Sequence, residues 1–225
     1  MPLSSPPELQ PTAAVHVNLA PPRLLEEALK REEAALAANG AIAACTHPHT
    51  GRSAKDKYAV VSPLTQEHVW WGDVNQPMQP EVFERVAGRV RAHLQGRDLF
   101  VFEGSACADP RHRLQVRVIA EKAWHILFAT WLLRREAPEA RRQAHGGPRR
   151  PLTIWHAPTL QLDPARDGVR TSAAIILDFE RRWIVIAGTH YAGEIKKSIF
   201  SYLNYALPFD GVFPMHCSAT RGDQG

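Results

Sequence analysis

The sequence predicts a mixed α/β fold in which strands and helices alternate and a substantial share of the strands pair antiparallel. Apolar residues recur at helical spacing in some stretches and form short strand-like runs in others. The two most apolar runs, residues 172–179 and 181–188, meet at a charged turn around Glu180, which indicates a hairpin in the middle of a sheet. Hydrophobic residues make up 44% of the 225 residues, enough for a substantial core.

The chain begins with a segment that we expect to be flexible. Residues 1–20 are rich in proline and serine, and they contain neither the charged region nor the apolar region of a secretory signal. Residues 21–225 are expected to form the folded domain. No apolar run approaches the length of a membrane span, so no membrane partner is expected.

The cysteine pattern points to a reducing compartment. Cys45, Cys107 and Cys217 are scattered and show no CxxC spacing, which favours neither a disulfide framework nor a structural zinc site. Together with the N-terminal segment, this pattern predicts a soluble protein of the cytoplasm.

Helical and strand-like patterns divide the first half of the chain. Residues 21–40 predict a helix, because leucines and alanines recur at helical spacing, prolines open the stretch and an Asn-Gly pair closes it. Short strands are expected at 41–45 and 57–61. Residues 80–95 predict an amphipathic helix. The apolar residues that share one face of that helix are Val82, Val86, Val90 and Leu94.

The second half continues the same alternation. Residues 98–104 and 114–120 predict strands, and the second alternates apolar with mostly polar side chains, as a half-buried strand does. Residues 121–133 predict a helix. The remaining expected elements are strands at 152–157, 172–179 and 181–188 and a helix at 191–206.

An arginine-rich stretch carries much of the net charge of +4. Residues 134–151 hold six arginines among prolines, glycines and alanines, a composition typical of a solvated loop. The stretch lacks the interleaved aromatic side chains on which single-stranded nucleic acids stack, so no nucleic-acid partner is expected. A small anionic substrate fits a mildly basic protein equally well.

The segment between the strands at 41–45 and 57–61 contains the first candidate site. Gly51 allows a tight turn, and the adjacent Arg52 can present two N–H groups to a carboxylate or a phosphate. An ordinary polar turn is the alternative interpretation.

Two lysines near the start of the last helix form the second candidate site. Free N–H groups at a helix start attract anions, whereas lysines there oppose the helix dipole and need another reason to be present. Because Lys196 and Lys197 lie about 100° apart around the helix, they point in different directions, and one can face a site while the other faces solvent. A solvated lysine pair is the alternative.

A histidine near the C-terminus forms the third candidate site. His216 follows Val212 and Phe213 and is interpreted as the end of a buried strand. A histidine in that place can ligate a metal, and the alternative is a core histidine with its hydrogen bonds satisfied.

In their order along the chain, these stretches closely resemble the ATP-dependent phosphoenolpyruvate carboxykinases. The matching stretches are "TGRSAKDKY", "WWGDVNQP", "GTHYAGEIKKSIFSYLNYALP" and "GVFPMHCSA". The resemblance runs from Val17 to Gly225. It implies the N-terminal domain of the carboxykinase fold, a mixed sheet with flanking helices.

The resemblance also implies an activity and roles for single residues. The family converts oxaloacetate and ATP to phosphoenolpyruvate, ADP and CO2 in gluconeogenesis, with Mg²⁺ on the nucleotide and Mn²⁺ at a protein site. By motif match, Arg52 would hold the substrate carboxylate and Tyr191 would line the same pocket. Lys197 and His216 would be Mn²⁺ ligands, with Lys197 also near the substrate and the transferring phosphoryl group, and Lys196 would assist catalysis from the edge of the site.

The sequence departs from the family in ways that bear on activity. It contains no GxxxxGK[ST] phosphate loop for ATP, and the third manganese ligand and a second substrate arginine of the family are also missing. Ala54 stands where relatives commonly have proline. We therefore expect the 225-residue chain alone to be inactive. The alternative functions are a non-catalytic module that binds a dicarboxylate or another anion, and a nucleic-acid-binding domain.

Overall fold

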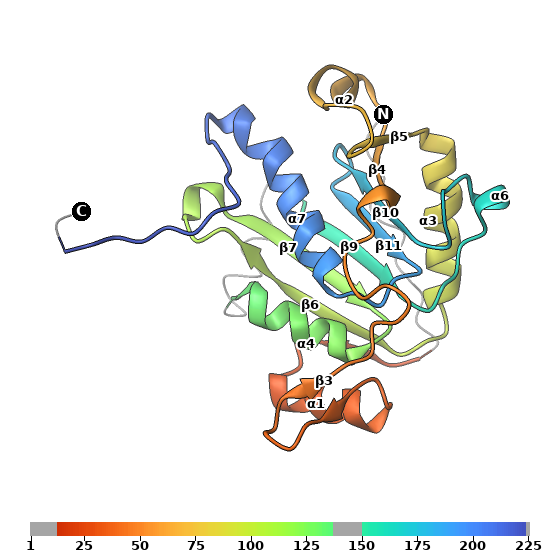
Figure 1. The fold of residues 1–225 in the computed structure, drawn as a ribbon, viewed down its shortest axis with the longest axis vertical. Helices are drawn as coiled ribbons and strands as arrows, with labels where there is room; N and C mark the ends of the chain where they lie inside the picture. The colour runs from red at the N-terminus through yellow and green to blue at the C-terminus, as the bar shows by residue number, and fades with distance from the viewer. Residues whose placement is uncertain (1–12, 137–149, 224–225) are drawn as a thin grey trace.

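A single large sheet with helices on both faces organises the protein. The computed structural model describes residues 13–136 and 150–223. The sheet has nine strands, and a separate two-stranded ribbon lies beside helix α1 (Figure 1). The strands of the large sheet are β1 (Val15–Val17), β4 (Lys57–Val60), β5 (Gln76–Met78), β6 (Leu99–Ala106), β7 (Leu114–Ala120), β8 (Arg134–Arg135), β9 (Leu152–Ala157), β10 (Ala174–Asp178) and β11 (Trp183–Ala187).

The sheet is mixed, as the sequence predicts. Its strands follow the order β1-β6-β7-β9-β11-β10-β4-β5, with β8 paired to β6. The pairs β6–β7, β10–β11 and β6–β8 are antiparallel, and the other pairs are parallel. The hairpin predicted around Glu180 is confirmed by the β10–β11 pair, whose turn includes Arg182 in a left-handed conformation (φ 59°).

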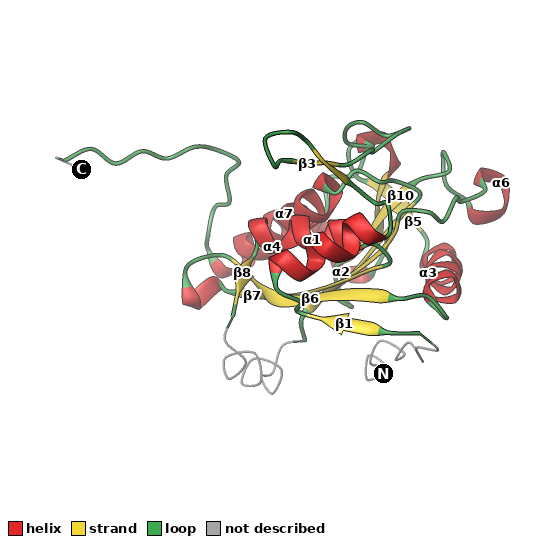
Figure 2. Cartoon of the chain, turned by 90° about the horizontal axis from the view of Figure 1, so that it is seen from below, coloured by secondary structure: helices red, strands yellow, loops and turns green. Residues whose placement is uncertain are grey.

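Helices cover the sheet in two layers. The α-helices are α1 (Pro21–Lys30), α2 (Pro63–His68), α3 (Pro80–Leu94), α4 (Ala123–Leu132), α6 (Pro164–Asp167) and α7 (Gly193–Ala206). One core joins α1, α4 and α7 to one face of the sheet, and another joins α3 to the opposite face. Figure 2 shows α1 and α4 packed together over β6 and β7.

Alternating side chains of the central strands pack into these two cores on opposite faces of the sheet. On β10, Ile175 and Leu177 pack in the first core, whereas Ile176 packs in the second. Both faces are therefore buried, which explains why this strand reads as a continuous apolar run instead of an alternating pattern. The predicted helix at 80–95 and the predicted strand at 114–120 are also confirmed, as α3 and β7.

The predicted helix at 21–40 is wrong in its second half. Helix α1 ends at Lys30 in a Schellman motif, in which Glu32 adopts a left-handed conformation (φ 56°) and the Glu33 N–H donates to the Ala28 carbonyl. Sequence patterns do not indicate this stop, because glycine is the usual residue at that position. The Glu33 carboxylate accepts from the Trp124 N–H at 3.0 Å and so caps the start of α4.

The Asn-Gly pair ends a strand instead of the helix. It lies in the turn between β2 (Ala35–Leu36) and β3 (Ile42–Ala43), where Gly40 has φ 80° and the Asn39 side chain accepts from the Ala41 N–H. An Asn-Gly pair between short strands is a hairpin signal, and it outweighs the helical spacing here.

Other differences lie at the edges of the sheet. Strand β1 falls within residues 1–20, the segment that we expected to be flexible, and pairs parallel with β6; residues 1–12 lie outside the described part of the chain. In the arginine-rich stretch, Arg134 and Arg135 form β8. Residues 137–149 of that stretch lie outside the described part of the chain. None of the helices in the described ranges is long and apolar enough to cross a lipid bilayer.

A buried pair of histidines lies in the core under α7. His125 on α4 and His156 on β9 are fully buried, and their rings meet edge to face with centroids 4.3 Å apart. Burial lowers the pKa of both side chains, that of His156 to about 4. Both rings are therefore neutral near pH 7.

The turn after β11 requires a glycine. Gly188 has φ 73°, and a Cβ atom there would overlap the Ser172 carbonyl oxygen and lie 2.9 Å from the Ala173 Cα. This close approach of two backbones directs the chain from the sheet into α7.

We predict that Gly188→Ala lowers the free energy of unfolding by more than about 3 kcal/mol, because left-handed strain and a backbone clash act together. Gly211→Ala is the matched control: its φ is 71° and nothing lies within 4 Å of the added Cβ, so it should lose only about 1 kcal/mol. Urea denaturation of both variants measures the difference. Equal losses would show that the contact with residues 172–173 does not constrain the turn.

We also predict that stability falls on acidification through the histidine pair. The folded-state pKa of His156 lies below its ordinary value of 6.5, so the unfolded chain binds more protons between pH 6.5 and about 4. The contribution of neutral His156 to the free energy of unfolding is fully present above pH 6.5 and is lost as pH falls to about 4. This loss is about 3 kcal/mol. Urea denaturation at several pH values should show a flatter profile for His156→Gln than for wild type. The exposed His68→Gln should leave the wild-type slope unchanged.

Candidate active site

The start of helix α7 brings together two segments that are far apart in the sequence. Helix α7 follows the Gly188 turn, and Glu194 lies in its first turn. The side chain of Glu194 is buried, and its Oε1 accepts from the Ser53 N–H at 2.8 Å across 141 residues of sequence. Its Oε2 lies 3.9 Å from Arg52 Nε. The buried carboxylate thus fixes the Arg52 loop against the helix.

The charges around Glu194 compensate one another. Burial raises the pKa of Glu194, while the Ser53 N–H, Arg52 and Lys57 oppose that rise. Burial likewise lowers the pKa of Lys57, and Arg52 lowers it further, whereas Glu194 raises it. Asp56, a second buried carboxylate, raises the pKa of Glu194. Glu194 thus stands between two basic side chains, of which Arg52 is 37% exposed.

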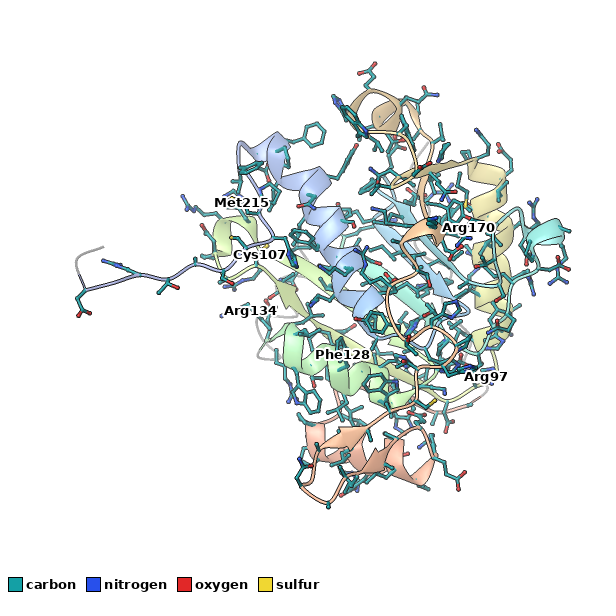
Figure 3. The ribbon with its side chains drawn as sticks, in the orientation of Figure 1. Arg97, Cys107, Phe128, Arg134, Arg170 and Met215 are labelled. Atoms are coloured by element: carbon teal, nitrogen blue, oxygen red, sulfur yellow. The ribbon has the colours of Figure 1, made fainter. Side chains whose placement is uncertain are left out.

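A second set of hydrogen bonds holds the same loop from the other side. The buried Asp56 accepts from Arg170 Nη2 and from the Thr171 hydroxyl, each at 3.0 Å. The Arg170 backbone N–H donates to the Tyr58 hydroxyl at 2.8 Å. Arg170 lies beside the start of β4 (Figure 3). Arg52 is thus carried by a segment anchored to both α7 and the chain before β10.

Lys197 and His216 meet on the same side of α7. Lys197 follows Glu194 by three residues, so both lie on one face of the helix. Lys197 Nζ lies 2.8 Å from His216 Nε2, and both side chains pack near the ring of Phe200. Lys196, in contrast, is exposed. The prediction that the two lysines point in different directions is confirmed.

The local structure predicted for His216 is wrong. It lies on an extended tail after α7 that forms no strand between residues 211 and 223, and its side chain is exposed. Met215, its neighbour on the tail, is also exposed, and Figure 3 shows it outside the sheet. Both the buried strand and the satisfied core histidine are therefore excluded; contact with Lys197 is what places this side chain.

The pair of nitrogens suits a metal ion that accepts nitrogen ligands. Two donors converge, one of them an imidazole, the commonest metal-binding side chain. A lysine nitrogen can join such a site only after losing its proton. Within residues 13–136 and 150–223, no group of three or more histidines, cysteines, aspartates or glutamates could hold a metal. These residues therefore offer a partial donor set of two nitrogens.

Tyr191 lies two residues before the first residue of α7. Its backbone N–H donates to the Thr189 hydroxyl at 3.2 Å, and its ring covers Gly193 so closely that a Cβ there would lie 2.5 Å from Tyr191 Cε1. The glycine is thus needed for the tyrosine ring to lie against the helix start, where the Tyr191 side chain is half-buried.

The fold and these residues define a class of protein: a mixed α/β domain with basic side chains along the first turns of one helix. Arg52 contacts Glu194 in the first turn, and Lys197 contacts His216. Guanidinium, amine and imidazole groups are chemically suited to carboxylate, phosphate and a divalent cation. The comparisons with known proteins give the particular family.

The family model described as phosphoenolpyruvate carboxykinase matches residues 13–225. "Phosphoenolpyruvate carboxykinase (ATP)" of Geobacillus thermodenitrificans is 48% identical over 212 residues, which cover 94% of this chain and 39% of the relative. The same-named proteins of Brucella suis and Methylorubrum extorquens are 48% and 50% identical, covering 40% and 38% of their lengths and 96% and 92% of this chain. The chain belongs to the ATP-dependent phosphoenolpyruvate carboxykinase family. It spans about two fifths of the length of these curated relatives.

Sequence reasoning assigned no role to Glu194 or to Lys57. An acidic residue in the first turn of a helix is normally interpreted as a favourable partner of the helix dipole. Its burial and its bond to Ser53 depend on a loop 141 residues away, which no local pattern indicates. The signal that was available was the position of Glu194 beside the lysine pair.

We predict that Glu194→Ala frees the Arg52 loop. The Ser53 N–H would lose its acceptor, and the buried site would lose the charge that compensates Arg52 and Lys57. Amide hydrogen exchange at Ser53 should become at least about tenfold faster, the effect of losing roughly 1.4 kcal/mol of local stability. Glu180→Ala, an exposed site in the β10–β11 turn, serves as the control. Unchanged protection of Ser53 in Glu194→Ala would contradict this account.

Proposed function

We propose that this chain supplies the substrate-binding and metal-binding side of an ATP-dependent phosphoenolpyruvate carboxykinase. The reaction converts oxaloacetate and ATP to phosphoenolpyruvate, ADP and CO2, the direction that serves gluconeogenesis, and the proposed location is the cytoplasm. One observation carries the proposal: Lys197 Nζ and His216 Nε2 converge to 2.8 Å on the same helix whose first turn holds the Glu194–Arg52 contact.

Arg52 is the proposed anchor for the substrate carboxylate. Its side chain is 37% exposed and its charge is only partly offset by Glu194, so the guanidinium remains available to an anion. A planar guanidinium matches a carboxylate with two parallel hydrogen bonds, which fixes orientation as well as position. Tyr191 would line the same pocket on the side where CO2 departs.

The lysines are proposed to stabilise charge as it develops. Loss of CO2 from oxaloacetate leaves an enolate, and transfer of the γ-phosphoryl group to its oxygen also proceeds through anionic species. The exposed ammonium group of Lys196 is at the edge of the site, where a positive charge lowers the energy of both anions. Because α7 is a rigid element, this charge is held in place before the reaction begins.

Lys197 and His216 are the proposed ligands of Mn²⁺, and Mg²⁺ would accompany ATP. A divalent cation supplies Lewis acidity at the oxygen that becomes negative and neutralises charge on the phosphoryl group. The contribution of this chain is two nitrogens already placed side by side. Binding through Lys197 requires its amine to be neutral, which a nearby divalent cation favours.

A second candidate function is a non-catalytic module for dicarboxylates. The observation that favours it is the Arg52 side chain, which is 37% exposed and whose charge Glu194 offsets only in part. Both candidates predict that the 225-residue chain assayed alone forms no phosphoenolpyruvate from oxaloacetate and ATP. Supplying a separate polypeptide that carries the phosphate loop should restore activity for the carboxykinase function and not for the module.

We predict that Mn²⁺ binds the purified chain through Lys197 and His216. Loss of the free Mn²⁺ signal in electron paramagnetic resonance measures binding directly. Lys197→Ala and His216→Ala should each weaken affinity at least about tenfold, since each removes one of two protein nitrogens. Lys196→Ala is the matched control, because this neighbouring lysine faces solvent and should leave Mn²⁺ affinity within about twofold. Equal effects of the two lysine variants would contradict the ligand assignment.

A further inference from the structure

The short segment between β11 and α7 leaves the sheet with backbone carbonyls that need partners. The ladder pairs of β11 end at Ala187, and the Gly188 N–H donates to the Ala157 carbonyl at 3.2 Å. Thr189 follows and is fully buried. A buried carbonyl without a hydrogen bond destabilises a fold. The carbonyls of Thr189 and His190 must therefore be satisfied from outside the sheet.

Two buried histidines from different elements reach these consecutive carbonyls. His156 Nε2 lies 3.1 Å from the Thr189 oxygen, and His125 Nε2 lies 3.0 Å from the His190 oxygen. Because a carbonyl oxygen only accepts, both rings must carry their proton on Nε2. The Nδ1 atoms of both rings are buried without a hydrogen-bond partner, so neither ring uses its other nitrogen for a competing contact.

Burial keeps both rings in this neutral form, because it lowers the pKa of each histidine. Lys122 Nζ lies 3.3 Å from the His190 Nδ1 atom. For His125, burial together with this positive neighbour disfavours the imidazolium state. Glu121 acts in the opposite direction on His156 by raising its pKa, and its carboxylate accepts from Thr159 and contacts His93. A neutral ring has a single N–H group, which here is committed to the backbone.

The position of Tyr191 depends on the two residues before it. Its N–H donates to the Thr189 hydroxyl, and its ring lies over Gly193. A shift of the Thr189–His190 backbone would therefore move the tyrosine ring relative to the helix start. Two histidines on α4 and β9, which belong to the rigid core, fix that backbone.

We infer that His125 and His156 are positioning residues for Tyr191: each donates its Nε2 proton to one of the two carbonyls that precede this side chain and so holds it at the start of α7. This inference rests on the proposed function of Tyr191 as a substrate contact. Neither histidine is placed to touch the substrate. A purely space-filling role is the competing explanation, and an apolar side chain of similar size separates the two.

The tautomers of the wild-type chain give the first test. Long-range proton–nitrogen correlation spectra of ¹⁵N-labelled protein at pH 7 should show both rings as neutral with the proton on Nε2. A proton on Nδ1, or a charged ring, in either residue would overturn the inference. This measurement needs no variant, so it holds even if substitutions prevent folding.

Paired variants give the second test. His156→Leu fills the space but cannot donate, whereas His156→Gln keeps an N–H donor; His125→Leu and His125→Gln form the same pair. We expect both leucine variants to speed amide exchange of Tyr191 at least tenfold, and both glutamine variants to restore most of the protection. His68→Leu, at an exposed site, is the control. Wild-type exchange in folded leucine variants would overturn the inference.

Binding of oxalate, a stable dicarboxylate, tests whether the backbone of Thr189 and His190 affects the proposed substrate contact of Tyr191. Nuclear magnetic resonance titration should show at least tenfold weaker oxalate binding in the leucine variants and near-normal binding in the glutamine variants, with Mn²⁺ affinity unchanged throughout. Equal oxalate binding by leucine and wild-type chains would overturn the inference. If the wild-type chain binds no oxalate while amide exchange responds as expected, the substrate role of Tyr191 fails and the positioning of its backbone stands.

Discussion

The buried carboxylate of Glu194 is the interaction on which the arrangement of the site depends. It accepts from the Ser53 N–H and faces Arg52, so it joins a loop near the start of the chain to a helix near its end. A buried carboxylate is stable only when its charge is matched, which ties the positions of Arg52 and Lys57 to that of α7. The cationic character of the site and its geometry therefore have one origin. The buried carboxylate that compensates the neighbouring basic side chains also orders the loop around it.

Helix geometry also determines the directions in which the two lysine side chains of α7 point. Consecutive lysines on α7 cannot face the same way, so the helix directs Lys197 toward His216 and Lys196 toward solvent. The backbone before the helix is equally constrained, because Gly188 turns against the chain at Ser172. These constraints are independent of any ligand. The side chains that would meet a substrate are thus arranged by the fold before a substrate arrives, which is the condition under which electrostatic stabilisation is most effective.

Sequence reasoning succeeded where local pattern and tertiary environment agree. The alternation at 114–120 predicts a strand because one of its faces is more deeply buried, and the lysine pair indicates the site because its chemistry conflicts with the helix dipole. It failed where contacts between residues far apart in the sequence determine the local structure. Where α1 ends, Glu32 adopts a conformation usual for glycine and the adjacent Glu33 accepts from Trp124, 91 residues away. His216 is placed by Lys197 on an exposed tail. The strand β1 forms from a short apolar stretch because β6 offers it an edge. In each case the deciding contact spans a separation that no local window covers.

The contact between Lys197 and His216 holds the two proposed metal ligands side by side. At 2.8 Å, one proton lies between two nitrogens, donated by one and accepted by the other. A divalent cation bound by the same two nitrogens, as we propose, would take the place of that proton. Metal binding would then release a proton and would weaken as pH falls. The hydrogen bond keeps both side chains in place meanwhile, so the entropy of bringing them together is already lost before the cation binds. The tail that carries His216 meets α7 through this pair of nitrogens and through the contact of the His216 ring with Phe200.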